Sequence, residues 1–189
     1  MKARIKTIIL SALGAIAAFT AVTSTSCEPD KCKAIVCAYG GVCKEGTCIC
    51  PAGYEGHQCE TITRDKFKGV WTVFENGTVT NSAQYEVSID YGSSLTEMVI
   101  KNFYNKFKDV TVNVRIKGDT MYIPQQTIQD HEIKGHAFLQ DDKYYGKNAN
   151  LQVFYSVKLP DGRTNDFGLS GVGNGEVSVW TRHGEEPQQ

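Results

Sequence analysis

The sequence of 189 residues has no cysteine after Cys59: all seven lie between Cys27 and Cys59. The first 26 residues contain no acidic residue, and the whole chain has five prolines. So few prolines, with a hydrophobic content of 41%, exclude a disordered or collagen-like chain. Without residues 1–26 the chain has 17 Lys and Arg against 21 Asp and Glu, a net charge of −4. Because nucleic-acid binding depends on clustered basic residues that neutralise phosphates, we expect no nucleic-acid partner.

Short motifs of the common catalytic sites are missing as well. The sequence has no Gly-x-Ser-x-Gly, no P-loop, and no cysteine beyond residue 59 for nucleophilic chemistry. The histidines of His131-Glu132-Ile-Lys-Gly-His136 are spaced one residue too widely for a zinc-protease motif, and on a strand they point to opposite faces. We interpret Asp141-Asp142 as a solvated loop tip. We therefore expect no metal, no cofactor and no enzymatic activity; a hydrolase whose carboxylates meet only in space is an alternative.

The N-terminus has the pattern of an export signal. Lys2, Arg4 and Lys6 precede an uncharged run over 7–26 that ends in small residues. This run, at about 20 residues, is long enough to span a bilayer. Its second half is rich in Ala, Thr and Ser rather than Leu, Ile and Val, so a retained transmembrane anchor is the less favourable alternative. The sequence predicts a signal peptide over residues 1–26.

Cys27 follows those small residues, and here the chain resembles a bacterial lipoprotein, in which this cysteine becomes the lipidated first residue. Ser24 departs from the branched apolar residue usual in that family, although a looser version occurs in the Bacteroidota. Ordinary signal-peptidase cleavage, with Cys27 left as a free thiol, is the alternative. Seven cysteines leave one unpaired, and lipid attachment removes that thiol. The resemblance implies a membrane anchor at Cys27, a linker over 27–31 and, from Glu28-Pro29-Asp30, display on the outer-membrane surface.

The remaining six cysteines form a compact cluster. So short a segment buries too little apolar surface to fold unaided, and disulfides at about 2–4 kcal/mol each supply the deficit. A zinc site is the competing interpretation, but paired Cys-x-x-Cys knuckles are absent and an exported chain meets oxidising conditions. Six cysteines allow 15 pairings, and spacing alone does not choose among them. The six are Cys32, Cys37, Cys43, Cys48, Cys50 and Cys59.

Residues 32–59 resemble an EGF-like module. The spacing Cys-x4-Cys-x5-Cys-x4-Cys-x-Cys-x8-Cys matches that family, and so does the ending, which places Tyr54 between Gly53 and Gly56. Glycines at these positions permit tight backbone turns. The resemblance implies the disulfides Cys32–Cys43, Cys37–Cys48 and Cys50–Cys59.

Some EGF-like modules bind calcium, but the residues for this are lacking here. Lys31 lies beside the place of the ion, and the central hairpin 44–47 offers no Asp or Asn, so too few oxygen ligands remain. We expect no calcium and interpret the module as a stiff spacer. Receptor binding, as in animal growth factors, is the alternative.

From Thr61 onward the pattern changes to short alternating strands. Turn signals at Gly118-Asp119, and two-residue hairpin signals at Asp161-Gly162 and Asn174-Gly175, separate them. With eight or nine antiparallel strands and no amphipathic helix, residues 60–189 are predicted to be an all-β, up-and-down barrel, with a β-sandwich as the alternative. The expected strands are 69–76, 84–91, 96–103, 110–117, 119–124, 131–139, 149–158, 164–170 and 175–182.

Gly69-Val-Trp71 resembles the Gly-x-Trp opening of lipocalins and related calycin barrels. In that family the tryptophan packs across the closed end under an arginine of the last strand, a part that Arg182 would take. The resemblance implies a cup for a small apolar ligand. The alternative is a barrel filled by its own side chains, which the 16 aromatic residues among the 19 of the chain favour here.

Three hypotheses for function follow from these patterns. The first is a binding module for a small molecule, a glycan or a host protein. The second is a protease-inhibitor-like or accessory subunit that contacts a protein through loops such as 104–109 and 140–148, and the third is the hydrolase. Separately, Asp119-Thr120-Met121 fits the O-glycosylation pattern of Bacteroidota exported proteins, which makes Thr120 a modification candidate.

Overall fold

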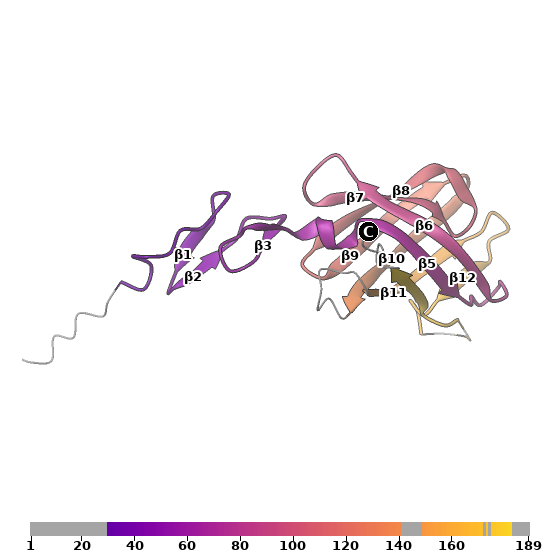
Figure 1. Ribbon diagram of the computed structural model, residues 1–189. Helices are drawn as coiled ribbons and strands as arrows, with labels where there is room; N and C mark the ends of the chain where they lie inside the picture. The colour runs from indigo at the N-terminus through magenta and orange to yellow at the C-terminus, as the bar shows by residue number, and fades with distance from the viewer. Residues whose placement is uncertain (1–29, 141–148, 172, 174, 183–189) are drawn as a thin grey trace, which may run out of the picture.

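The computed structural model describes residues 30–140, 149–171, 173 and 175–182. Within them the chain forms a small disulfide-rich module followed by a closed antiparallel barrel, so the all-β prediction is confirmed. Figure 1 shows the module extending from one end of the barrel. Cys27, the segment 1–26 and Asp141-Asp142 lie outside the described residues. In the part of the chain that is described, no helix is long and apolar enough to cross a membrane.

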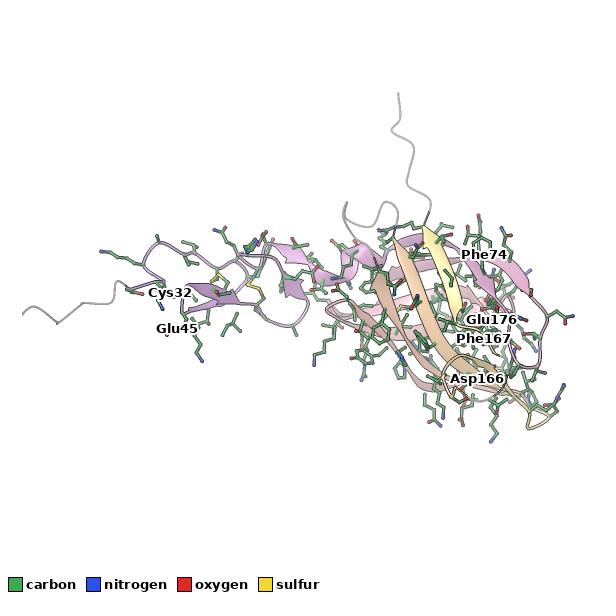
Figure 2. All side chains as sticks on the ribbon, turned by 90° about the horizontal axis from the view of Figure 1, so that it is seen from below. Cys32, Glu45, Phe74, Asp166, Phe167 and Glu176 are labelled. Atoms are coloured by element: carbon green, nitrogen blue, oxygen red, sulfur yellow. A yellow bond between two sulfur atoms is a disulfide. The ribbon has the colours of Figure 1, made fainter. Side chains whose placement is uncertain are left out.

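Two short hairpins and three disulfides build the module. β1 (Val42–Lys44) pairs with β2 (Thr47–Ile49), and β3 (Tyr54–Glu55) pairs with β4 (Thr61–Ile62). Between residues 30 and 60, the only buried residues are two of the bridged cysteines. Disulfides rather than an apolar core therefore stabilise this part of the chain. They join Cys32 to Cys43, Cys37 to Cys48 and Cys50 to Cys59, the pairs that the EGF-like resemblance implies (Figure 2).

The glycines of the module's last turn have the backbone conformation that only glycine adopts easily. Gly53 has φ +92° and Gly56 has φ +96°. A Cβ at Gly53 would lie 3.0 Å from the Cβ of Leu95, so this glycine also allows the module to approach a loop of the barrel. Tyr54 stacks on Tyr39, with the ring centres 4.5 Å apart, and stiffens the turn.

A 3-10 turn, η1 (Thr63–Phe67), leads into a sheet of nine strands. Side chains alternate between the buried interior and the outer face along these strands, as the period-two pattern predicts. The strands are β5 (Gly69–Glu75), β6 (Ala83–Tyr91), β7 (Glu97–Phe103), β8 (Phe107–Lys117), β9 (Thr120–Ile128), β10 (His131–Gln140), β11 (Asn150–Lys158), β12 (Thr164–Phe167) and β13 (Ser178–Arg182).

The sheet closes on itself. Each strand from β5 to β11 pairs antiparallel with the next, and β13 then pairs with both β11 and β5. The β-sandwich alternative is therefore wrong. Closure leaves eight strand positions around the barrel and no open sheet edge between β5 and β13.

The last strand position departs from a simple up-and-down order. β12 pairs with residues 156–158 of β11, and β13 pairs with residues 150–153 of the same strand. Both run antiparallel to β11, so they are two halves of one strand position. The predicted strands 164–170 and 175–182 are shortened to these two halves. Asn174 of the predicted Asn174-Gly175 hairpin lies outside the described residues.

The other two turn signals both lie in hairpins, but the two-residue loop predicted at Asp161-Gly162 is wrong in length. Lys117 pairs with Thr120, so Gly118-Asp119 is the two-residue loop, and Gly118 has φ +58°. Asp161-Gly162 lies in a five-residue loop, because Lys158 pairs with Thr164. β9 also continues to Ile128, four residues past its predicted end.

Candidate functional site

The barrel end beside the module is closed by the three residues that the lipocalin resemblance names. Arg182 pairs in register with Trp71, and its guanidinium carbon lies 5.0 Å from the centre of the indole ring. The guanidinium also donates to the carbonyls of Lys66, at 3.1 Å, and Lys68. A Cβ at Gly69 would lie 3.3 Å from the Cδ of Arg182, so a larger residue there would crowd the arginine. The structure thus brings Gly69, Trp71 and Arg182 together.

Lys66 joins this end of the barrel to the module. Its Nζ lies 2.9 Å from Glu55 Oε2 in the module and 2.5 Å from Asp119 Oδ1 in the β8–β9 turn. Burial alone would lower the pKa of Lys66, but the hydrogen bonds and charges of Asp119 and Glu55 outweigh it and raise the pKa. Because a buried ammonium without partners is costly, these two carboxylates fix the lysine in place.

The opposite end of the barrel is covered by residues 76–82, which Asn165 holds in place. Its side-chain Nδ2 donates to Thr80 Oγ1 at 2.8 Å and to the Tyr104 hydroxyl at 2.9 Å, and its Oδ1 accepts from the Val79 backbone N–H at 2.8 Å. Asn165 is fully buried, so each of these bonds satisfies a group that has lost its water. A Cβ at Gly77 would lie 2.2 Å from Asn165 Oδ1, which explains the glycine there.

Side chains occupy the space between the two ends. Phe103 of β7 lies 4.8 Å from the ring of Tyr155 on β11 and 6.1 Å from that of Trp180 on β13, measured between ring centres. Tyr155 in turn stacks on Phe167 at 4.3 Å. Rings from opposite strands therefore meet across the barrel axis, and Ile100 and the other buried aliphatic residues, each at most 5% exposed, pack around them. This is the filled interior, not the cup of a lipocalin.

Glu75 places a carboxylate in this apolar interior. Its Oε1 accepts from the Tyr85 hydroxyl at 2.8 Å, and its Oε2 accepts from the Tyr155 hydroxyl at 2.7 Å and from Ser178 Oγ at 3.0 Å. Burial raises the pKa of Glu75, although the three donors act in the opposite direction. Burial and the charge of Glu75 also raise the pKa of Tyr85, so the phenol stays protonated as a donor. Glu75 is a satisfied core acid that faces hydroxyl groups rather than a second carboxylate.

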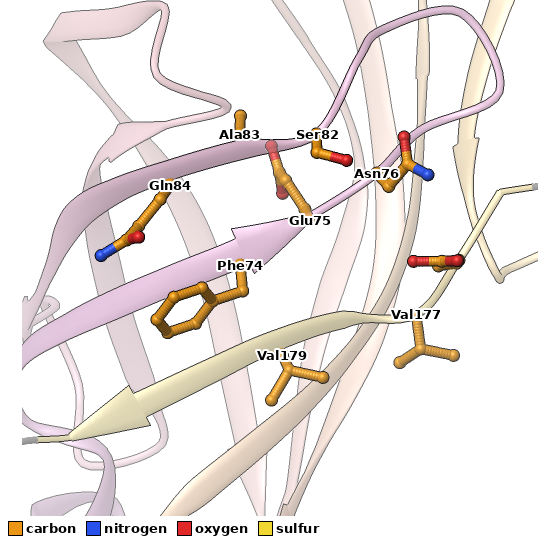
Figure 3. Close-up of a pocket in the computed structure, with 9 residues that line it drawn as sticks. Phe74, Glu75, Asn76, Ser82, Ala83, Gln84, Val177 and Val179 are labelled. Atoms are coloured by element: carbon orange, nitrogen blue, oxygen red, sulfur yellow. The ribbon is translucent and has the colours of Figure 1, made fainter.

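A surface pocket of about 440 Å³ lies on the outside of the barrel where β5, β6 and β13 meet. Phe74 projects from β5 between Gln84 of β6 and Val179 of β13, as Figure 3 shows. Asn76 and Glu176 add an amide and a carboxylate at the end of the pocket, and the Glu176 backbone N–H donates to the Asn76 carbonyl at 3.0 Å. An exposed ring with amides beside it can hold a ligand that has both apolar and hydroxyl faces.

The two histidines named by sequence lie on opposite faces of β10. His131 is buried, and its Nδ1–H donates to the Gln129 carbonyl at 2.6 Å while Nε2 accepts from Lys106 Nζ at 3.0 Å. His136 lies on the outer face, stacked on Phe154 at 5.2 Å. Among the described residues, no group of three His, Cys, Asp or Glu side chains is placed to hold a metal ion.

Thr120 opens β9 on the outer face, half-buried, next to the Asp119 that pairs with Lys66. Of the two loops named for a protein contact, 104–109 includes the turn between β7 and β8. Residues 107–109 belong to β8, and residues 141–148 lie outside the described part of the chain.

Sequence reasoning missed Glu75, Asn165 and Phe74. A signal for two of them was present: along β5 the period of two places Glu75 on the same face as Trp71 and Val73, and Phe74 on the other. Asn165 carries no such signal, because it stands in a short polar run of the chain and its partners are more than 60 residues away.

Fold and site together define a disulfide-rich module followed by a filled antiparallel β-barrel with a polar-aromatic pocket on its outer face. No protein-family model matches the chain. A similar solved structure is a Bacteroides ovatus protein of unknown function, 12% identical, with a TM-score of 0.38 over 61% of this chain. The match covers 41% of that protein, so the present chain spans well under half of its length. A likeness this distant identifies neither a family nor an activity.

Proposed function

We propose that the chain is a lipid-anchored protein of the cell envelope, displayed on the outer-membrane surface, whose disulfide-rich module is a stiff spacer for a barrel that binds a ligand on its outer face. The filled interior is the observation that supports ligand binding on the outer face. Aromatic rings meet across the barrel axis. Arg182 closes one end of the barrel, and Asn165 fixes residues 76–82 over the other end. The exposed pocket around Phe74 is then a place where a ligand can bind.

The EGF-like and lipocalin-like assignments belong to the same proposal. The three disulfide pairs and the glycines at 53 and 56 support the first. The contact of Arg182 with Trp71 above Gly69 supports the second, as a closed end rather than as a ligand cup. The anchor at Cys27 rests on sequence alone.

Lipid labelling tests the anchor. The full chain, expressed in a bacterial host and fed an alkyne fatty acid, should carry the label, and Cys27→Ala should lose it while the protein is still exported. Protease added to intact cells should release the barrel from the wild-type protein. An unlabelled wild-type protein, or one that protease reaches only after the outer membrane is opened, contradicts the anchored surface display.

Native mass spectrometry of the solubilised full chain tests the outer-face binding. The filled interior predicts the bare protein mass plus lipid, with no small apolar molecule retained. A molecule of several hundred daltons that co-purifies and is displaced by palmitate would contradict the proposal, because it would show an interior cup.

A further inference from the structure

We infer that the outer face carries a binding row for an extended neutral oligosaccharide, which begins at the Phe74 pocket and crosses the strands to Phe138. This inference rests on the proposed outer-face binding and names its ligand class. The row follows from strand register, in which each member stands directly opposite the next on the neighbouring strand. Its members, in spatial order, are Gln84, Phe74, Val179, Gln152, Phe138 and Thr120.

The row alternates apolar surface with amides. Phe74 and Phe138 are each 43% exposed and Val179 is 36% exposed, so two rings and a valine present apolar faces to solvent. Three strand spacings separate the two rings, about 14 Å along the sheet. Among the described residues, the side-chain amides of Gln84 and Gln152 make no hydrogen bond, so their donors and acceptors are available.

These properties match a sugar chain. A pyranose ring has C–H faces that pack on an aromatic ring, and hydroxyl groups that both donate and accept, as an amide does. The row contains no charged side chain, which favours a neutral chain over an acidic one. The spacing of the two rings requires a ligand of several sugar units, since a single sugar contacts only one of them.

A protein partner fits the row less well. The row is one residue wide, whereas a stable protein interface buries about 800 Å² on each side around a central hydrophobic core. Gln152 separates Phe138 from Phe74 and Val179, so the apolar surface forms two parts rather than one central core. One part is Phe74 with Val179, and the other is Phe138 with its neighbours His136 and Phe154. We therefore assign the row to a carbohydrate.

Calorimetric titration of the solubilised full chain with neutral oligosaccharides tests the assignment. The probes are hexasaccharides and disaccharides of glucose, mannose, xylose and N-acetylglucosamine. At least one hexasaccharide should bind, at least about tenfold tighter than its disaccharide, because only the longer chain reaches both rings. Phe74→Ala and Phe138→Ala should each weaken hexasaccharide binding about fivefold or more.

Tyr91→Ala is the matched control, because Tyr91 is also 43% exposed but does not lie on the row. It should leave the affinity within about twofold of wild type. All three variants should still unfold in one cooperative transition, above the temperature of the titration. Absence of binding to every probe overturns the assignment, as does binding that ignores Phe74→Ala or Phe138→Ala.

The remaining outcome is that the outer face binds a protein instead of a sugar chain. A benzophenone amino acid at position 74, photolysed on intact cells, tests for it. A discrete protein adduct, without oligosaccharide binding, overturns the carbohydrate assignment and leaves outer-face binding in place. Failure of the proposed function itself is seen separately, as an interior ligand in the native mass spectrum.

Discussion

Glu75 is a titratable side chain that is buried away from bulk water. It lies among aromatic residues, and three hydroxyl groups surround its carboxylate. Its pKa is raised above the ordinary value of 4.5, because the desolvation of the charged form outweighs the three donors. The folded chain therefore holds the Glu75 proton more tightly than the unfolded chain does. The stability gained in this way is complete below the unfolded pKa and is lost as pH rises through the folded pKa.

Glu75→Gln removes this pH dependence. We expect the melting temperature of wild type, relative to that of the variant, to fall as pH rises from about 4 to about 8, because only wild type must ionise a buried carboxyl. Thermal unfolding followed by tryptophan fluorescence measures the difference. Glu86→Gln, on the outer face, is the control and should run parallel to wild type. A Glu75→Gln difference that stays constant or changes in the opposite direction with pH would contradict the burial argument.

The second prediction at the scale of single residues concerns Asn165. Asn165→Ala removes three partly buried hydrogen bonds and leaves the Val79 N–H without its acceptor. We expect the free energy of unfolding to fall by about 2–4 kcal/mol. Urea titration measures it, with the exposed Asn113→Ala as the control. A loss below about 1 kcal/mol would mean that residues 76–82 are held by other contacts.

At the scale of elements, the alternation of apolar and polar residues was enough to place most strands. Val112, Val114 and Ile116 point inward as period two predicts. β8 covers the predicted range 110–117 but begins three residues earlier, at Phe107. The pattern did not reveal that β12 and β13 share one position along β11, because register between distant strands is set by packing rather than by local sequence. The outer-face row could not be predicted from the sequence, for the same reason. Its members belong to six strands and become neighbours only when the barrel closes.

At the closed end of the barrel, one part of the site could be predicted from the sequence and another part could not. Gly69, Trp71 and Arg182 were identifiable from a resemblance, and the structure places them in contact. Lys66 and its two carboxylates were not, since Glu55, Lys66 and Asp119 have no common spacing and meet only through the fold.

At the scale of the whole molecule, the parts of the chain before and after Cys59 are stabilised in different ways. The module is stabilised by disulfides, and the barrel by a continuous apolar core. Both tryptophans of the chain, Trp71 and Trp180, are fully buried in the barrel, so their fluorescence reports on that part alone.

Cys32→Ser combined with Cys43→Ser tests this separation. We expect the module to lose about 2–4 kcal/mol, because the bridge no longer restricts its unfolded chain. Limited proteolysis should then cut within residues 32–59, while the tryptophan unfolding midpoint stays at the wild-type value. Ala52→Ser, exposed in the module, is the control. An equal drop in the tryptophan midpoint would show that module and barrel unfold as one unit.

The central claim is that the barrel recognises its ligand on the outer face and has no room for one inside. The most direct measurement is a methyl-resolved NMR spectrum of the solubilised full chain, recorded with the oligosaccharide probes and then with palmitate. Val177 and Val179 line the outer pocket, whereas Met98, Ile100 and Val112 line the interior. We predict saturable shifts at the two outer valines with an oligosaccharide and none at the interior methyls with palmitate. Saturable palmitate shifts at Met98, Ile100 and Val112 would contradict the account.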